Sequence, residues 1–354
     1  MSGLTKARVI VAGGGALGST IALRLAWAGA RVTLADPADP ADSASGVAAG
    51  MLAPAFESVL DPDAGPSFAT LKAARDLWPA LAERLGEIGL RRSGAVWVDL
   101  PEAPPRAAAL TAAFERLGAQ VAPSPTSGFP GFGEALFTPE DWRLDPAATL
   151  RALRRAMAEA GVEVVRAGLE PFADGQARFS DGARLPAEFV VIATGARGGA
   201  LTPELARLIP IKGQILKYPA HAAAPDGPAI RCALGYAVGG ADGLSVGATM
   251  EVGRADLEVD PEVVARLRAL AERLHPALVG VAASARAGVR AASPDGAPLI
   301  GASAREGIWL AAGARRNGWL LAPLAAEIIA AELAGRDAGP YAAALSPRRL
   351  GLGG

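Results

Sequence analysis

Cysteine and histidine are nearly absent from this chain. Cys232 is the only cysteine among 354 residues, and His221 and His275 are the only histidines. A single cysteine forms no intrachain disulfide and no cluster of thiolate ligands, and two isolated histidines do not match the spacing of a metal site or of a Ser-His-Asp triad. We therefore predict no metal site, a reducing, cytoplasmic environment, and a surface or loop position for both histidines.

The chain also has little net charge and no long apolar run. The formal net charge is −1, so no global field recruits nucleic acid or an anionic membrane. The longest apolar stretch, residues 319–334, is interrupted by Glu327 and Glu332, whereas a bilayer span needs about 20 predominantly apolar residues. The N-terminal sequence MSGLTKAR contains no apolar region of a signal peptide. We expect no membrane span, no cleaved leader and no nucleic-acid partner.

What the chain does contain is typical of an ordered α/β enzyme. Hydrophobic residues make up 51% and charged residues 20% of the sequence, a composition that does not fit a disordered or fibrous protein. A length of 354 residues exceeds what one simple core requires. We therefore predict two domains.

The N-terminal segment carries a nucleotide-binding pattern. Residues 8–12 predict a strand, residues 16–29 a helix and residues 31–35 a second strand. Between the first strand and the helix lies GGGALG. Such a βαβ unit with a glycine-rich turn is the typical binding site of a dinucleotide.

The spacing of the glycines specifies what each one does. Gly13, Gly15 and Gly18 give G-x-G-x-x-G. The first glycine permits the tight turn, the second lets a pyrophosphate approach, and the third lets the helix meet the strand. Asp36 ends the second strand, where a carboxylate accepts hydrogen bonds from ribose hydroxyls and disfavours a 2′-phosphate. The pattern predicts NAD or FAD.

The rest of the chain alternates between two patterns. Strands and helices follow one another again after Asp145, the predicted N-cap of a helix, and one strand runs into the small-residue turn Ala193-Thr194-Gly195. Residues 209–250 instead form short β-rich segments, which indicates an inserted antiparallel sheet. We predict an α/β fold, α+β overall. Its discontinuous Rossmann-like domain comprises residues 1–85, 145–210 and 286–354, and its substrate domain comprises residues 86–144 and 211–285.

Five segments, taken in order, resemble a known family. They are GGGALG with Asp36, SASGVAAGMLAP (43–54), IKGQIL (211–216), GVRAASPDGAPLIG (288–301) and GARRNGWLLAP (313–323). Together they resemble the flavin-dependent D-amino acid oxidase superfamily, and within it the glycine oxidases of the thiamine-pathway ThiO type. The resemblance covers nearly the whole chain. It implies FAD rather than NAD, bound non-covalently because Cys232 lies outside the C-terminal stretch where a related branch attaches its flavin.

The resemblance also implies which residues hold the FAD. Free N–H groups at the start of the last long helix would stabilise negative charge on the flavin. The implied cofactor-binding residues are Gly13, Gly15, Ala16, Leu17, Gly18, Asp36, Ser43, Ser45, Ala48, Ala49, Gly50, Met51, Thr194, Gly195, Gly313, Arg316, Asn317, Gly318, Trp319 and Leu320.

Four residues are implied as catalytic. Arg290 matches the carboxylate-binding arginine of the superfamily, and a guanidinium holds a carboxylate with two parallel hydrogen bonds. Its alternative role is a strand-end arginine paired with Asp295. Arg316 matches a second active-site arginine, Tyr236 a substrate-side tyrosine and Met51 a flavin-side methionine. A tyrosine on a half-buried strand or a methionine in a core also occurs without any function.

The same region departs from the family in four places. Leu234 stands where glycine oxidases usually carry a histidine, and Gly239-Gly240 replace the usual Pro-Arg. Ala314 and Arg315 replace a histidine-aromatic pair, and Trp319 replaces a smaller aliphatic residue. We expect Arg315 to be a solvated neighbour of the site. These departures leave the preferred amino acid open.

The implied activity is the oxidation of glycine or another small amino acid or amine to its imine, with oxygen reduced to hydrogen peroxide, in thiamine (thiazole) biosynthesis. A thiazole synthase as partner and a homo-oligomeric state are left open. The alternatives are a D-amino acid dehydrogenase that uses a quinone or another acceptor, a non-catalytic FAD-binding protein, and an NAD-linked dehydrogenase.

Overall fold

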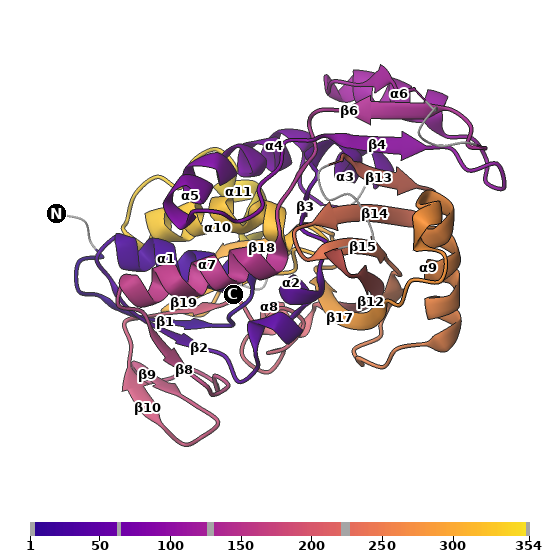
Figure 1. Cartoon of the computed structure of the whole chain (residues 1–354). Helices are drawn as coiled ribbons and strands as arrows, with labels where there is room; N and C mark the ends of the chain where they lie inside the picture. Colours follow the sequence, from indigo (N-terminus) through magenta and orange to yellow (C-terminus); the bar gives the residue numbers. More distant parts are fainter. Residues whose placement is uncertain (1–3, 62–64, 126–130, 221–226, 352–354) are drawn as a thin grey trace.

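The computed structural model describes residues 4–61, 65–125, 131–220 and 227–351, and it places two β-sheets side by side (Figure 1). One sheet is mainly parallel and is packed among helices from both ends of the chain. The other is mainly antiparallel and comes from the middle of the chain. The predicted combination of a parallel and an inserted antiparallel sheet is confirmed.

The parallel sheet collects strands from three separate stretches of the chain. They are β1 (Arg8–Ala12), β2 (Arg31–Ala35), β8 (Glu163–Val165), β11 (Phe189–Ile192), β18 (Leu299–Ala302) and β19 (Ile308–Ala312). Their order is β18-β19-β11-β1-β2-β8, and every pair is parallel except β18 with β19. The sheet is therefore complete only when strands from the two ends of the chain, about 300 residues apart, come together.

Both faces of this sheet are buried. Val9 and Val11 contribute to a core with α1 (Ala16–Trp27), α7 (Pro146–Glu159) and α10 (Gly318–Leu333). Ile10 points to the opposite core, which includes the hairpin of β9 (Gln176–Arg178) and β10 (Arg184–Pro186) and the short α8 (Pro203–Ala206). Strands buried on both faces read as continuous apolar runs, which explains why RVIVA predicts a strand.

The antiparallel sheet is organised around one long strand, β12 (Ile209–Tyr218), which pairs with three neighbours. The other strands are β4 (Ala95–Val98), β5 (Ala122–Pro123), β6 (Ala135–Thr138), β13 (Ala229–Cys232), β14 (Gly235–Gly240), β15 (Gly243–Gly247), β16 (Glu251–Val252) and β17 (Ser284–Ala292). The order is β16-β12-β15-β14-β13-β4-β6-β5, with β17 added to β12. Only β13 and β4 pair in parallel.

The two faces of this sheet have different partners. Leu216 and Leu244 pack against α9 (Pro261–Leu274). Ile215 and Val238 point the other way, into a core with α2 (Ala44–Val47), α3 (Pro54–Leu60) and α6 (Ala107–Leu117). Figure 1 shows α9 on the outer side of the sheet and α2 between the two sheets. The face that carries Ile215 therefore looks toward the parallel sheet.

The remaining described elements cover the edges. They are α4 (Phe68–Asp76), α5 (Trp78–Leu85), α11 (Ala342–Leu345), the strand pair β3 (Met51–Leu52) and β7 (Trp142–Arg143), and the 3-10 turns η1 (Pro40–Asp42), η4 (Pro276–Leu278) and η5 (Pro347–Leu350). None of the described helices combines the length and the apolar character that crossing a bilayer requires.

Two local predictions can be followed directly in the fold. Asp145 is the N-cap of α7, and its Oδ1 accepts a hydrogen bond of 2.8 Å from the N–H of Ala148, as predicted. β17 pairs with β12 along residues 284–292, so the predicted boundary between residues 285 and 286 falls inside a strand of the antiparallel sheet. The division into two domains stays a prediction.

The turn between β1 and α1 depends on glycine at two positions. Gly13 has a φ of 105°, and a Cβ there would overlap the carbonyl of Ala193 at the end of β11. A Cβ on Gly18 would overlap the carbonyl of Gly13. The first and third glycines of the motif thus hold helix and strands in direct backbone contact.

Replacing Gly13 should therefore destabilise the whole parallel sheet. We expect Gly13→Ala to lower the free energy of unfolding by about 2 kcal/mol or more, because the new Cβ meets backbone and the residue must keep a positive φ. Urea unfolding measures this loss. Gly227→Ala is the control, because no atom of the described residues, apart from those of its chain neighbours, lies within 4 Å of a Cβ at that position. Equal midpoints for the two variants would contradict the prediction.

Candidate active site

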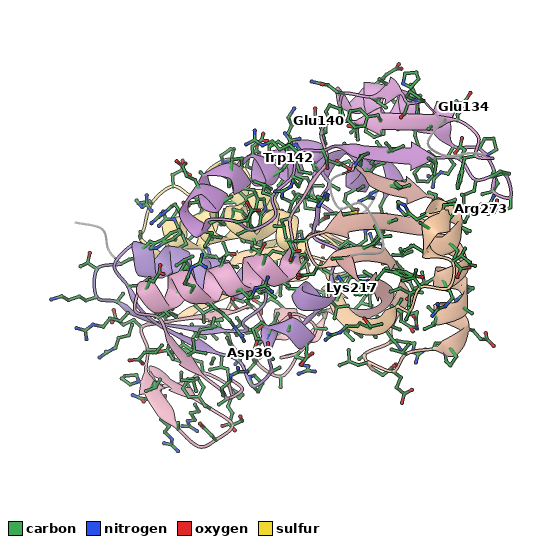
Figure 2. All side chains as sticks on the ribbon, in the orientation of Figure 1. Asp36, Glu134, Glu140, Trp142, Lys217 and Arg273 are labelled. Atoms are coloured by element: carbon green, nitrogen blue, oxygen red, sulfur yellow. The ribbon has the colours of Figure 1, made fainter. Side chains whose placement is uncertain are left out.

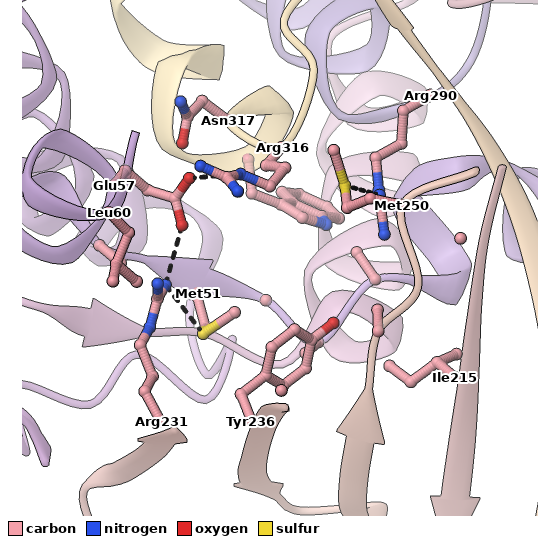
Figure 3. Close-up of a pocket in the computed structure, with 18 of the residues that line it drawn as sticks. Met51, Glu57, Leu60, Ile215, Arg231, Tyr236, Met250, Arg290, Arg316 and Asn317 are labelled. Atoms are coloured by element: carbon pink, nitrogen blue, oxygen red, sulfur yellow. Dashed lines mark hydrogen bonds and ion pairs between the residues drawn. The ribbon is translucent and has the colours of Figure 1, made fainter. Parts of the chain in front are cut away.

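A cavity of ≈300 Å³ lies on the face of the antiparallel sheet that carries Ile215. Its wall combines α2, the β3–α3 segment, strands β12 to β14, β17 and the start of α10. The volume lies at the lower end of the range of small-molecule sites. The four residues predicted to be catalytic, Met51, Tyr236, Arg290 and Arg316, all line this cavity (Figure 3).

The turn after β1 presents backbone donors at the N-terminus of α1. Gly15 is the N-cap residue, and a Cβ there would meet only the side chain of Ser45. Ser45 Oγ accepts a 2.9 Å hydrogen bond from the N–H of Ala16. Among the described residues, no oxygen accepts from the N–H of Gly15 or Leu17. Open approach and free donors at a helix N-terminus suit a diphosphate.

Asp36 lies at the end of β2, beside that turn. Its Oδ2 accepts a 2.6 Å hydrogen bond from the N–H of Gly14, and its Oδ1 accepts one of 2.9 Å from the N–H of Ala38. The carboxylate is half-buried. It therefore fixes the glycine turn and still has lone pairs for hydroxyl donors.

The segment after β2 runs from the turn to the cavity. Ser43 Oγ accepts a 3.2 Å hydrogen bond from the N–H of Gly46 and caps α2. Ala48, Ala49 and Gly50 then line the cavity. Lys217, on β12, donates to the carbonyl of Ala48 at 3.0 Å. Figure 2 shows Lys217 where the antiparallel sheet meets α2, and burial lowers its pKa to about 8. This lysine ties the segment to the sheet.

The N-terminus of α10 forms another part of the wall. Asn317 is the N-cap residue, and its own N–H donates to Ala314 at 2.7 Å. In the described part of the chain, no acceptor pairs with the N–H groups of Gly318, Trp319 or Leu320. The indole Nε1 of Trp319 donates to the carbonyl of Ser45 at 3.0 Å. A helix end with free donors therefore lies against α2.

The other predicted cofactor residues lie nearby in the fold. Thr194 and Gly195 follow β11, next to the glycine turn. Gly313 follows β19, and a Cβ there would touch Leu208 and Ser293 rather than the cavity wall. The side chain of Leu320 is fully buried in the core. Only the backbone of these last two residues is suited to contact a ligand.

Arg290, on β17, has no carboxylate partner among the described residues. Its Nη1 donates to Met250 Sδ at 2.8 Å and to the carbonyl of Thr249 at 3.4 Å. Burial lowers the pKa of Arg290, although a guanidinium stays charged. The alternative pairing with Asp295 is wrong, because Asp295 binds Arg349 instead, at 2.8 Å. Arg290 thus presents an unneutralised positive charge to the cavity.

Three residues form an ion cluster on the opposite side of the cavity. Glu57 Oε1 accepts a 2.9 Å hydrogen bond from Arg231 Nη2, and Arg316 Nε lies 2.7 Å from Glu57 Oε2. The same Nη2 lies 3.3 Å from Met51 Sδ. Burial alone would raise the pKa of Glu57, but the charges of Arg231 and Arg316 outweigh it and lower that pKa. The carboxylate is therefore ionised and engaged, and is not available as a base.

Arg315 turns away from solvent. It pairs with Asp61, which also lies 3.3 Å from Arg316 Nη2. Its side chain is only 24% exposed, and its φ is 50°. The prediction that Arg315 is a solvated neighbour is wrong, because its guanidinium pairs with Asp61 and most of its side chain is covered.

Tyr236 and Leu234 mark the inside and the mouth of the cavity. Burial raises the pKa of Tyr236, so its hydroxyl stays protonated and can donate. Leu234 is 58% exposed and lines the cavity. His275 lies in the loop directly after α9, as predicted, whereas His221 lies outside the described residues.

Sequence reasoning missed Glu57 and Arg231. Arg231 is opposite Tyr236 in the β13–β14 register, and Glu57 is 174 positions away in the chain. Both side chains are less than 10% exposed. A charged residue inside an otherwise apolar strand, as in AIRC, was the available signal.

Buried Asp141 positions the helix that carries Glu57. Its carboxylate accepts hydrogen bonds from the N–H groups of Ala55 and Phe56, at 2.9 and 3.3 Å, and so caps α3. Burial raises the pKa of Asp141 to about 6. Asp141 therefore caps α3 although burial of its negative charge destabilises the folded protein.

Comparisons with known proteins agree with this geometry. A family model described as FAD dependent oxidoreductase matches residues 8–332. A glycine oxidase of Pseudomonas aeruginosa is 31% identical, over 95% of this chain and 98% of that protein. The bifunctional protein ThiO/ThiG of Synechocystis sp. is 30% identical, over 98% of this chain and 54% of that protein. The crystal structure of glycine oxidase from Geobacillus kaustophilus has a TM-score of 0.84 at 27% identity, over 97% of this chain and 99% of that one.

The Asp141 cap leads to a prediction about pH. Its folded-state pKa of about 6 exceeds the ordinary 3.8, so the folded state binds the proton more tightly. The cost of ionisation appears as pH rises from about 4 and is complete above about 6. Relative to Asp141→Asn, the wild type should thus lose about 3 kcal/mol across this window.

Urea unfolding of both proteins between pH 4 and 7.5 measures this difference. Asp181→Asn, at an exposed turn, is the control and should follow the wild type throughout. A difference between wild type and Asp141→Asn that does not change with pH would contradict the prediction.

Proposed function

The chain belongs to the FAD-dependent oxidoreductase family whose model spans residues 8–332, and from this premise we propose that it oxidises glycine or another small amino acid or amine to the imine, with oxygen as electron acceptor. It is an FAD-dependent amino acid oxidase similar to glycine oxidase. The observation that carries the choice of substrate is Arg290, a guanidinium without a carboxylate in the cavity wall.

The residues present fit an FAD. The free N–H groups of Gly15 and Leu17 and the open side of Gly15 would hold the diphosphate, and Asp36 would accept from ribose hydroxyls. The free N–H groups at the start of α10 and the segment that ends at Met51 would hold the flavin. When bound, FAD would supply the acceptor for the two electrons of the substrate's Cα–H bond, which breaks as the Cα–N bond becomes an imine.

Arg290 would orient the substrate by its carboxylate. A bidentate contact of this kind contributes about 1.5–3 kcal/mol. The hydroxyl of Tyr236, kept protonated by burial, would donate to the same substrate. Met51 and Ile215 exclude water from the remaining wall. The chain thus contributes binding and orientation.

No described side chain of the wall is placed to act as a base. Glu57 is ionised but engaged by Arg231 and Arg316. We therefore propose that the amine enters in its neutral form. The imine then leaves and is hydrolysed by water to the oxo acid and ammonia, while oxygen is reduced to hydrogen peroxide.

We also propose three finer assignments. Similarity to part of a ThiO/ThiG protein supports a role in thiamine (thiazole) biosynthesis, with a thiazole synthase as the partner that consumes the imine. Cys232 lines the cavity, but burial raises the pKa of its thiol, and a protonated thiol is a poor nucleophile, which supports non-covalent FAD. The single cysteine of the chain supports a reducing, cytoplasmic compartment. Release of the yellow cofactor on acid precipitation tests the mode of attachment.

Anaerobic reduction tests the proposed activity. Glycine, sarcosine and a panel of D-amino acids are added to the purified holoenzyme without oxygen, and the flavin absorbance is followed. Bleaching by one of them supports the proposal, and peroxide on readmission of oxygen supports oxygen as acceptor. Bleaching without peroxide would indicate a dehydrogenase with another acceptor. A flavin that no amine or amino acid reduces would overturn the proposal.

Arg290→Ala should show whether Arg290 binds the substrate or only supports the fold and the cofactor. We expect the variant to retain FAD and to lose about a hundredfold or more in kcat/KM, because the substrate carboxylate loses its charge-assisted contact. Steady-state peroxide production measures the loss, and the flavin spectrum reports cofactor content. The control is Arg116→Ala, at an exposed position of α6. Undiminished turnover in Arg290→Ala would remove this arginine from the site.

A further inference from the structure

The cavity wall carries far more positive than negative charge. Its lining residues, all of them described, include one carboxylate, that of Glu57, and four guanidiniums, those of Arg106, Arg231, Arg290 and Arg316. A single carboxylate on a small amino acid neutralises only one of these charges. The excess indicates that the intended ligand brings more negative charge than glycine does.

The single negative charge of Glu57 does not neutralise both of the arginines that it contacts. One of its oxygens lies 2.9 Å from Arg231 and the other 2.7 Å from Arg316. Asp61 lies behind Arg316 and pairs mainly with Arg315. These three arginines and two carboxylates leave one positive charge, and Arg290 adds a second.

Asp141 lies behind the wall, where its charge attracts Arg231 and offsets only part of this excess. Its carboxylate is 1% exposed and is directed to the N–H groups of Ala55 and Phe56. It does not line the cavity. A charge at that depth lowers the cost of burying Arg231 but leaves its donors unsatisfied.

Arg231 has unused donors. Its Nη2 serves both Glu57 and Met51, while its Nε is buried without an acceptor among the described residues. That atom is shielded from the cavity, so Arg231 would act on a ligand through its charge and its remaining N–H groups. Arg106, over the Trp97 ring at 5.4 Å, is exposed and has no ion-pair partner in the described chain. The side of the cavity away from Arg290 is thus also built for an anion.

Figure 3 shows how the two anion positions are arranged. Arg290 with Met250 lies on one side of Tyr236, and Arg231 with Glu57 lies on the other. The strand register explains this, because Arg231 and Tyr236 are partners across β13 and β14, whereas Arg290 comes from β17 beyond β12. A ligand held at Arg290 therefore extends past the tyrosine toward Arg231.

We propose that the preferred substrate is an amino or imino dicarboxylate, with one carboxylate on Arg290 and the second on Arg231 and Arg316. This substrate class rests on the proposed amino acid oxidation. Arg231 acts as a specificity-determining residue, and it contributes equally before and during the reaction. Its contribution therefore belongs mainly to KM.

Two matched pairs of compounds test the proposal on the wild-type holoenzyme. Iminodiacetate and sarcosine share the N-substituted glycine skeleton and differ by one carboxylate. Aspartate and asparagine, each as both enantiomers, differ only in the charge of the side chain. We expect kcat/KM from anaerobic flavin reduction to be about tenfold or more higher for the dicarboxylate of at least one pair. Equal values within both pairs, with sarcosine or glycine still reducing the flavin, would overturn the substrate class and leave the proposed function intact.

A binding measurement tests the substrate class separately from the oxidation reaction. Succinate and propionate cannot be oxidised at a Cα–N bond, and their binding is read from the change in the flavin spectrum. We expect succinate to bind about tenfold or more tightly than propionate. If no amine or amino acid reduces the flavin, the proposed function fails, and the substrate class fails with it even if succinate binds.

Variants then assign the effect to Arg231. In Arg231→Met, the preference for the dicarboxylate, measured as the ratio of kcat/KM within each pair, should fall about tenfold or more through KM. Arg231→Lys should restore part of the preference because it restores the charge. Arg116→Met is the matched surface control. A loss that is equal for both members of a pair, with KM unchanged, would show that Arg231 has only a structural role.

Discussion

The carboxylate of Glu57 joins three parts of the chain that lie far apart in sequence. It is carried by α3, and it binds Arg231 of the antiparallel sheet and Arg316 of the loop before α10. Without it, the guanidiniums of Arg231 and Arg316 would lie together on one side of the cavity with no carboxylate between them, which costs several kcal/mol per ion. The position of α10, which packs on the parallel sheet, relative to the antiparallel sheet thus depends on the side chain of Glu57.

The arginines of this region divide by their partners. Arg315 and Arg349 bind Asp61 and Asp295, and so hold loops in place. Arg290 has only a thioether and a distant carbonyl as acceptors. A half-buried guanidinium without a carboxylate has a desolvation cost, and in the wall of a cavity a ligand carboxylate would offset that cost. The absence of a described partner is therefore more informative than the presence of an arginine.

The sequence predicted what is decided locally. The glycine turn and the Asp145 cap depend on φ angles and hydrogen bonds within a few residues. Their patterns can therefore be recognised in the sequence alone. The resemblance to a family located Arg290 and Tyr236, which the structure brings to one cavity. The pairing of Glu57 with Arg231 was not legible, because it joins residues 174 positions apart. The pairing of Arg315 with Asp61 was not legible either, because it joins residues 254 positions apart.

The excess positive charge of the cavity wall attracts both the carboxylates of the substrate and the electrons that leave it. In a dry cavity, it favours whatever brings negative charge inside, whether substrate carboxylates or the two electrons that leave the substrate. A second substrate carboxylate would neutralise part of the wall before the electrons move, and so would weaken its attraction for them. Arg231 lies with Glu57 across Tyr236 from Arg290, so a second carboxylate would draw chiefly on the charges of that side. The free N–H groups at the start of α10 are not consumed by that contact. Separate sources of positive potential would therefore limit, but not remove, the loss of driving force for oxidation when an anionic substrate binds.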